Sequence, residues 1–236
     1  MNNANLYNLF LERFPKDPTA LFLDGVDGRL HYREVPQRTG QMLSLLQQSG
    51  VQKGDRVVVQ VEKSIEAVLL YLACLRAGAI YIPLNTAYTP KELGYFLQDA
   101  TPRLFVCAPD RKDALAPVVR AAGVPVVLSL GAGGEGELSE AAATAPASEQ
   151  VVEVDADDLA AILYTSGTTG LSKGAMLSHA NLASNAQVLH DYWHWQGDDV
   201  LLHALPIFHV HGLFVALHCA LLGGSRLIFL PRFDAD

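Results

Sequence analysis

The sequence has few cysteines, no cluster of basic residues and no long hydrophobic run. Its 236 residues include three cysteines, Cys74, Cys107 and Cys219, each within an apolar stretch and without metal-type spacing. We expect them to be reduced core residues of an intracellular protein, since a disulfide framework needs more, and more regularly spaced, cysteines. The apolar runs are shorter than the roughly 20 residues that span a bilayer, so no transmembrane helix is expected.

A targeting signal and a surplus of positive charge are also missing. The N-terminal stretch "MNNANLYNLF" has neither the basic start nor the long apolar core of a signal peptide, which predicts a cytoplasmic protein. The 17 basic residues are outnumbered by 25 acidic ones, and the net charge is −8. This balance argues against a nucleic-acid surface, and an anionic ligand would have to be bound by a local site in a repelling overall field.

The hydrophobic residues, half of the total, are arranged in short continuous runs. Such runs are typical of strands that are buried on both faces, as in a parallel sheet. The runs lie at 56–61, 79–83, 103–107, 124–128, 159–164, 200–205 and 226–230. Helix candidates lie mainly between them, at 33–49, 64–77, 90–98, 111–122, 178–190 and 210–222. This alternation predicts an α/β fold of layered sheets with helices on both faces.

Local signals mark some helix boundaries and one division of the chain. Ser64, Thr89 and Ser178 are each placed to cap the N-terminus of a helix. Residues 131–150 are rich in Gly, Ala, Glu and Ser, which is typical of a surface connection. We therefore expect one α/β subdomain over 1–150 and the start of a second over 151–236.

The stretch "YTSGTTGLSKG" (164–174) combines four hydroxyl side chains, three glycines and one lysine directly after a predicted strand. Glycine lets backbone N–H groups approach a ligand closely, and ligands of open α/β sheets bind beyond the carboxyl ends of strands. Hydroxyl donors and the Lys173 cation suit a polyphosphate. The spacing differs from that of the common P-loop, and a flexible Gly/Thr surface loop is the alternative.

The same stretch resembles the phosphate-binding motif of the adenylate-forming superfamily, which contains acyl-CoA synthetases, luciferases and the adenylation domains of peptide synthetases. Ser172 stands where that motif usually has proline. Residues 70–89 and 204–233 resemble two further motifs of the superfamily. Within it, the sequence is most similar to the malonyl-CoA synthetases.

The resemblance implies an AMP-forming ligase that joins a carboxylic acid, here malonate, to coenzyme A with ATP and Mg²⁺. The loop would wrap the β- and γ-phosphates, Thr168 would lie at the metal, and Lys173 would act in catalysis by holding the departing pyrophosphate. The residues implied to bind the nucleotide are Thr165, Ser166, Gly167, Thr168, Thr169, Gly170 and Lys173.

Histidines gather shortly after this loop. His209 and His211 follow Pro206 and precede Gly212 at a predicted strand-to-helix junction. The resemblance implies that this junction borders the acyl substrate, with His211 nearest the reacting carboxylate as a catalytic residue and His209 second in line as a substrate contact. A metal site is the alternative for the H-x-H pair, as in a metal hydrolase. Two further histidines, His203 and His218, are expected to be core or helix-face residues.

Two functional alternatives stay open. The acyl substrate could be a medium-chain or other fatty acid, because no residue in 1–236 stands out as the partner of malonate's second carboxylate; Arg226 and Arg232 are expected at the surface. The resemblance also places later motifs of the family beyond residue 236. We therefore expect the chain alone to be inactive and to expose apolar surface, and a fragment that only binds nucleotide is the second hypothesis.

Overall fold

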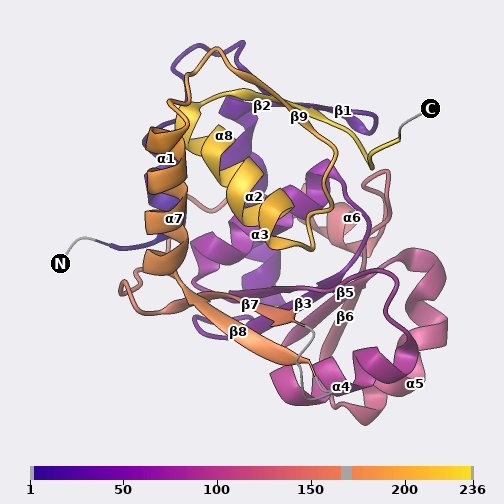
Figure 1. Ribbon diagram of the computed structural model, residues 1–236. Coiled ribbons are helices and arrows are strands. Elements are labelled where there is room, and N and C mark those ends of the chain that lie inside the picture. The colour runs from indigo at the N-terminus through magenta and orange to yellow at the C-terminus, as the bar shows by residue number, and fades with distance from the viewer. Residues whose placement is uncertain (1–2, 166–171, 235–236) are drawn as a thin grey trace.

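The computed structural model describes residues 3–165 and 172–234, in which two mainly parallel sheets are stacked with helices (Figure 1). The larger sheet contains, in spatial order, β6 (Val126–Ser129), β5 (Leu104–Cys107), β3 (Arg56–Gln60), β4 (Ile80–Pro83), β7 (Leu159–Thr165) and β8 (Lys173–Ser178). The smaller sheet contains β2 (Gly28–His31), β1 (Leu21–Gly25), β10 (Arg226–Phe229) and β9 (Val200–His203). Only the β1–β2 and β7–β8 pairs among these strands are antiparallel.

Helices connect the strands. The α-helices are α1 (Leu6–Leu11), α2 (Val35–Gln48), α3 (Ile65–Ala77), α4 (Pro90–Ala100), α5 (Lys112–Ala121), α6 (Glu137–Thr144), α7 (His179–Tyr192) and α8 (Leu217–Gly223). Short 3-10 turns precede α2 and α5, and a π-helix (His211–Ala216) leads into α8. None of the helices in the described part of the chain has both the length and the hydropathy of a bilayer-spanning segment.

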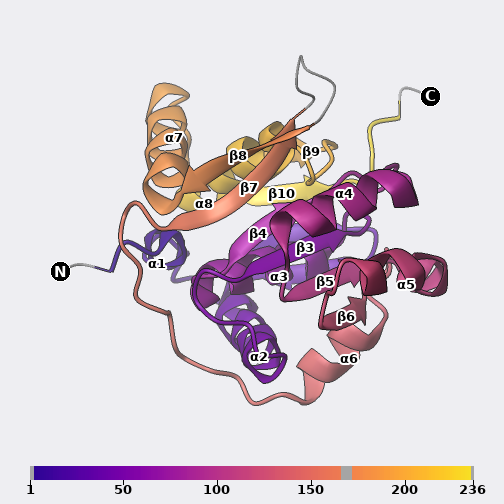
Figure 2. The same ribbon diagram turned by 90° about the horizontal axis from the view of Figure 1, so that it is seen from below.

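The elements form layers, as the sequence predicts. Helices α2, α3 and α8 lie between the two sheets, and α4 and α5 cover the other face of the larger sheet (Figures 1 and 2). Every residue of α3 except Glu66 is buried. A helix that is apolar all round belongs in such an inner layer, which explains why α3 shows no polar face.

The central strand β3 shows how both faces of the larger sheet are filled. Val57 and Val59 belong to the large core between the sheets, whereas Val58 belongs to a second core under α4 and α5. Successive side chains of a strand point to opposite faces. A continuous run of valines therefore serves two cores at once, and the predicted α/β fold with helices on both faces is confirmed.

The predicted helix caps are present. The Ser64 side chain accepts a hydrogen bond from the Ala67 N–H at 3.2 Å, and Thr89 and Ser178 each form a capping box. Gly78 caps the C-terminus of α3 directly after its last residue, Ala77, and its φ of 63° favours glycine. Each cap satisfies backbone donors or acceptors that a helix end leaves unpaired.

Four elements escape the sequence-based prediction: α1, β1, β2 and β8. Strand β8 is mostly exposed and lacks an apolar run, and β1 and β2 are short strands interrupted by charged residues. Strands from both sides of residue 150 take part in each sheet, because β1 pairs with β10 and β4 pairs with β7. The subdomain division at residue 150 stays a prediction.

Candidate active site

The β7–β8 hairpin carries the two ends of the predicted phosphate loop. Thr165 and Lys173 face each other as cross-strand partners, and the Thr165 hydroxyl donates to the Lys173 carbonyl oxygen at 3.5 Å. Both residues are exposed at the end of the hairpin where the chain passes from β7 to β8, which we call the loop end of the hairpin. A hydroxyl and a lysine predicted to bind the nucleotide are thus brought together.

The remaining residues of that loop cannot be placed in the same way. The predicted contacts Ser166, Gly167, Thr168, Thr169 and Gly170 lie outside the described residues. Their roles at the phosphates, and that of Thr168 at the metal, stay predictions.

Helix α4 supports the hairpin from one side. The Tyr95 hydroxyl donates to the Ser172 carbonyl oxygen at 2.7 Å, and the Tyr164 hydroxyl donates to Asp99 Oδ2 at 2.6 Å. The ring of Tyr164 also packs on Phe96, with 4.6 Å between centroids. Burial and the Asp99 carboxylate raise the pKa of Tyr164, so its hydroxyl stays a donor at neutral pH. Both strands of the hairpin are therefore anchored close to the predicted loop.

Sequence reasoning missed Tyr95 and Asp99. Tyr95 lies within the predicted helix 90–98, and Asp99 lies one residue past its predicted end. The two are four residues apart, and side chains at this spacing share one helix face. That spacing is the signal that could have identified them, but it does not say which strand the helix packs against.

Residues 204–212, which we call the histidine turn, follow β9 and include the first two residues of the π-helix, His211 and Gly212. His209 and His211 are both exposed there, and the Leu213 N–H donates to the His209 carbonyl oxygen at 3.0 Å. In both ribbon views the segment after β9 lies near the loop end of the β7–β8 hairpin (Figures 1 and 2). The two predicted histidines thus lie on the same side of the molecule as the hairpin end that carries Thr165 and Lys173 (Figures 1 and 2).

His203 and His218, predicted as core or helix-face residues, are both buried. Burial lowers the pKa of His203 to about 4 and that of His218 to about 3. His218 is held by the Tyr71 hydroxyl, 2.7 Å from its Nε2. Within residues 3–165 and 172–234, no three His, Cys, Asp or Glu side chains are grouped so as to hold a metal ion. A hydrolytic metal centre at the H-x-H pair therefore gains no support from the described residues.

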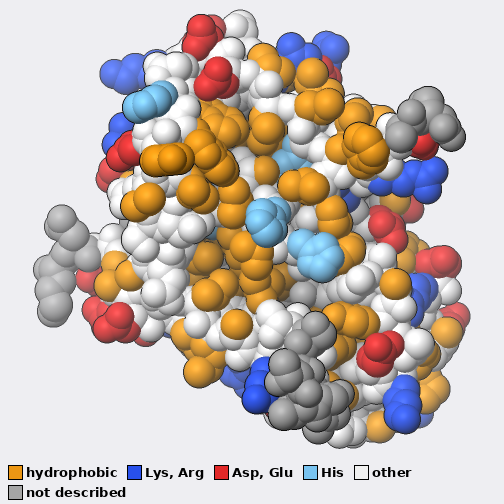
Figure 3. All heavy atoms as spheres, in the orientation of Figure 1, with side chains coloured by type: hydrophobic (Ala, Val, Ile, Leu, Met, Phe, Trp, Pro, Cys, Tyr) orange, Lys and Arg blue, Asp and Glu red, His pale blue; other side chains and the backbone are white. Residues whose placement is uncertain are grey.

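The surface around the histidine turn is rich in apolar side chains. Figure 3 shows them gathered where α7, α8 and the segment after β9 lie, with histidines among them (Figure 3). The large exposed apolar residues of α7, β9 and the segment after β9 are Val188, Tyr192, Val200, Leu202, Leu205 and Val210. This side of the chain can therefore offer apolar contacts as well as imidazole donors.

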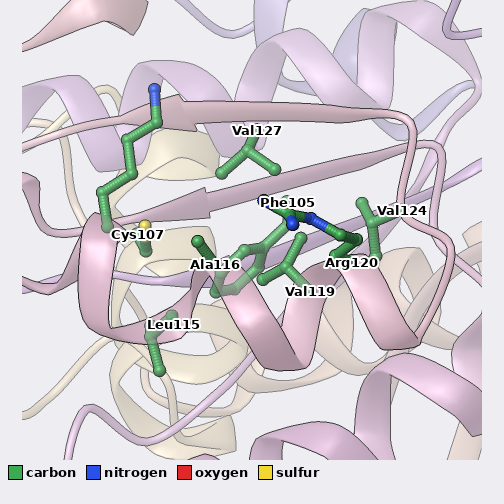
Figure 4. A pocket seen from close by; sticks show the side chains of 9 residues that line it. Phe105, Cys107, Leu115, Ala116, Val119, Arg120, Val124 and Val127 are labelled. Atoms are coloured by element: carbon green, nitrogen blue, oxygen red, sulfur yellow. The ribbon is translucent and has the colours of Figure 1, made fainter.

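A cavity of about 260 Å³ lies elsewhere, between α5 and the strands β5 and β6 (Figure 4). Its walls are mostly apolar, and Lys112 and Arg120 stand at it. Burial raises the pKa of Cys107, one of its lining residues, to about 11, so this thiol is not an activated nucleophile. The cavity contains none of the predicted site residues.

The two arginines weighed as partners of a second carboxylate lie at the surface, as expected. Arg226 forms an ion pair with Asp24, and the side chain of Arg232 is 83% exposed. Neither provides a buried cation for the distal carboxylate of malonate.

Comparison with known proteins connects both candidate regions to one family. The family model of AMP-binding enzymes matches residues 10–236. The chain is 35% identical to the mitochondrial malonate–CoA ligase ACSF3 of Mus musculus, over 89% of the chain and 36% of that protein. It is 30% identical to the long-chain-fatty-acid–CoA ligase FadD13 of Mycobacterium tuberculosis, over 89% of the chain and 41% of that protein.

Solved structures give the same result. The crystal structure of ATP-bound MatB from Rhodopseudomonas palustris superposes with a TM-score of 0.93 at 51% identity, covering 98% of this chain and 46% of that one. The chain therefore spans less than half the length of the relatives named here.

Proposed function

The chain belongs to the family of AMP-binding enzymes, and from that premise we propose that the complete protein ligates malonate to coenzyme A through an acyl-adenylate. The observation that carries the proposal is the loop end of the β7–β8 hairpin, where Thr165 and Lys173 are cross-strand partners. The histidine turn lies near this end of the hairpin (Figures 1 and 2). A polyphosphate site next to imidazole donors is what the adenylation of a carboxylate requires. The similarity to malonate–CoA ligase ACSF3 and to MatB favours malonate as the acid.

A carboxylate is a poor electrophile because it is negatively charged and lacks a leaving group. Its attack on the α-phosphate of ATP releases pyrophosphate and gives an acyl-adenylate, from which the thiol of coenzyme A displaces AMP. By analogy with phosphoryl transfer, the protein mainly positions the reactants and neutralises charge. In the first half-reaction, the formation of the acyl-adenylate, Lys173 holds the pyrophosphate as it departs, and the Thr165 hydroxyl donates to a phosphate oxygen.

His211 binds the reacting carboxylate, and His209 borders the acyl group. A neutral imidazole N–H can donate to a carboxylate oxygen, and so orient the acid without giving up a proton. Both side chains are exposed on the face that also presents apolar residues.

Mg²⁺ is part of the proposal because ATP carries it, and it would neutralise phosphate charge. Its proposed contact, Thr168, lies outside the described residues. No step above depends on the ion.

The test is pyrophosphate release by the complete gene product with ATP, coenzyme A and one of four acids: malonate, methylmalonate, acetate or octanoate. A clear preference for malonate supports the proposal. Turnover of octanoate without malonate would keep the ligase chemistry but replace the substrate. Absence of carboxylate-dependent release would contradict the proposal as a whole.

A fatty acid is the second candidate substrate, and two observations favour it. FadD13 is described as a long-chain-fatty-acid–CoA ligase, and large apolar side chains surround the histidine turn. The octanoate arm of the experiment separates this candidate from malonate. The 236 residues alone are proposed to be inactive, which the same assay on that chain examines, and a cytoplasmic location also stays a proposal.

A further inference from the structure

Lys63 lies between the end of β3 and the start of α3, and its ammonium group reaches the smaller sheet. Its Nζ lies 2.7 Å from His203 Nδ1, 2.7 Å from the His203 carbonyl oxygen and 2.6 Å from the Leu230 carbonyl oxygen. A lysine ammonium has three N–H donors and no acceptor, so these three acceptors use all of them. Nζ also lies 4.1 Å from the ring centroid of Phe229. Lys63 thus joins the two sheets where β9 and β10 end.

These contacts determine which nitrogen of His203 carries the proton. While Lys63 carries its proton, as it does at about pH 6, its ammonium group can only donate, so His203 Nδ1 must accept and is unprotonated. In a neutral ring the proton then lies on Nε2, which is 2.9 Å from the Gly212 carbonyl oxygen. Only this tautomer allows Nε2 to donate to that oxygen while Nδ1 accepts from Lys63.

The surroundings keep the ring neutral. His203 is 1% exposed, and its burial, followed by the charge of Lys63, lowers its pKa to about 4. Burial also lowers the pKa of Lys63, to about 7, against the opposing effect of the Asp27 carboxylate. Asp27 accepts a hydrogen bond from the Ile65 N–H at 2.8 Å, which fixes it at the start of α3.

Gly212 is the point at which this chain of hydrogen bonds reaches the histidine turn. It directly follows His211 and is buried in the first turn of the π-helix. A Cβ at Gly212 would lie 2.2 Å from the Pro206 carbonyl oxygen, so the two ends of the turn touch through backbone. A change in the position of the Gly212 carbonyl would therefore be passed to His211.

We propose that Lys63 is a positioning residue for the acyl-binding histidines: its ammonium fixes the Nε2–H tautomer of His203, which holds the Gly212 carbonyl and thereby orients His211. The part of this proposal that concerns His211 and the carboxylate rests on the proposed function. The hydrogen-bond chain from Lys63 to Gly212 does not, so the two can be tested apart.

The first test measures the tautomer directly. Long-range ¹H–¹⁵N correlation spectra of the complete gene product, labelled with ¹⁵N-histidine and held at about pH 6, report which ring nitrogen of His203 is protonated. The proposal requires Nε2–H in the wild type and loss of that pure signature in Lys63→Met. An Nδ1–H tautomer in the wild type overturns the proposal even if the variant fails to fold. An unchanged Nε2–H signature in Lys63→Met overturns it as well.

The second test separates positioning from stability by steady-state kinetics. Lys63→Met is expected to raise the KM for malonate about tenfold while the KM for ATP stays within about twofold, because only the histidine turn is displaced. Lys63→Arg, which keeps donors for the same acceptors, is expected to restore most of the malonate KM. Equal changes in both KM values, or no rescue by arginine, overturn the proposal.

A matched control is available in Lys53→Met. Lys53 forms a partly exposed ion pair with Asp158 and is not part of either candidate region, so its loss should leave both KM values unchanged. If the wild type releases no pyrophosphate with any carboxylate, the proposed function fails, and the tautomer measurement still decides the role of Lys63.

Discussion

The loop end of the β7–β8 hairpin and the histidine turn lie on one side of the molecule but are held in different ways. The hairpin is supported from outside by α4, through partly exposed tyrosine hydroxyls and aromatic rings. The histidine turn is held from within, by the buried His203 ring and the Lys63 ammonium. Thr165 and Lys173 of the hairpin are exposed, and so are His209 and His211 of the histidine turn.

The comparison indicates what each region tolerates. Aromatic packing and neutral hydroxyl donors depend little on pH, and losing one such hydrogen bond costs about 1 kcal/mol. A buried network of an ammonium group and a neutral imidazole depends on every member, because an unpaired polar group in the interior is costly. Substitutions should therefore have local effects at the hairpin and larger, more cooperative effects at the histidine turn.

The largest effect on activity is expected at Lys173, which is an exception among the hairpin residues because it contacts the reacting phosphates in the proposed reaction. Its cation contacts the departing pyrophosphate in the proposed reaction, so Lys173→Ala should lower kcat/KM by a factor on the order of 100 to 1,000 without unfolding the protein. Pyrophosphate release and thermal unfolding of the same sample measure both quantities. Lys91→Ala, which removes an exposed lysine of α4, is the control and should be active. Equal activity of the two variants would contradict the role of Lys173.

Alanine at one glycine in each region tests the contrast in packing. At Gly212 the new Cβ would meet the Pro206 backbone at 2.2 Å, whereas at Gly174 it would meet the Ile162 side chain at 2.8 Å. The Pro206 backbone cannot rotate away from the new Cβ, so Gly212→Ala should lower the free energy of unfolding by about 3 kcal/mol. The half-buried Ile162 side chain can shift only slightly, because its Cγ2 is fixed on a branched Cβ, so Gly174→Ala should cost less, about 1 kcal/mol. Urea titrations measure both, and similar losses would show that the two regions are equally constrained.

Acid should destabilise the interior through three buried histidines, of which His203 holds the histidine turn. Burial lowers the pKa of His203 and His179 to about 4 and that of His218 to about 3. Between about pH 6.5 and pH 4 the unfolded chain binds protons at these histidines that the folded chain does not. Stability is therefore present above about pH 6.5 and falls with decreasing pH, by up to about 1.4 kcal/mol per pH unit for each histidine.

Urea midpoints at about pH 7 and pH 5 measure this loss. His203→Gln should reduce the pH dependence, since glutamine does not titrate. His194→Asn removes an exposed histidine whose φ of 54° asparagine tolerates, and it should leave the pH dependence unchanged. A pH dependence that is the same in all three proteins would show that the buried histidines do not control acid stability.

The smallest effect is expected at the support of the hairpin. Tyr95→Phe removes the hydrogen bond to the Ser172 carbonyl oxygen but keeps the ring, at a cost of about 1 kcal/mol. The KM for ATP should rise about fivefold while the KM for malonate is unchanged. Tyr88→Phe is the control, because the ring of Tyr88 packs on Phe96 beside Tyr95. A rise in the malonate KM would indicate that α4 also supports the histidine turn.

The sequence predicts the layered architecture well because its signals are local. Continuous apolar runs identify β3 to β7, β9 and β10, and Ser64 and Thr89 mark helix starts that the structure contains. The exposed strand β8 has no such run, and the pairing of β1 with β10 joins residues about 200 positions apart. Neither feature has a local signal.

The candidate site is predictable only in part. Thr165, Lys173, His209 and His211 follow from motif and resemblance; all four are exposed, and their roles stay predictions. Lys63 is different, because in the sequence it is a lysine before a helix cap, 140 residues from His203. Its role depends on three distant acceptors that only the folded chain brings together.

ATP–pyrophosphate exchange by the complete gene product, measured with malonate and without coenzyme A, tests the central claim most directly. If the hairpin and the histidine turn serve one adenylation reaction, malonate alone should support exchange of labelled pyrophosphate into ATP, and AMP should be released once coenzyme A is added. Exchange that does not require malonate, or release of ADP in place of AMP, would contradict the account.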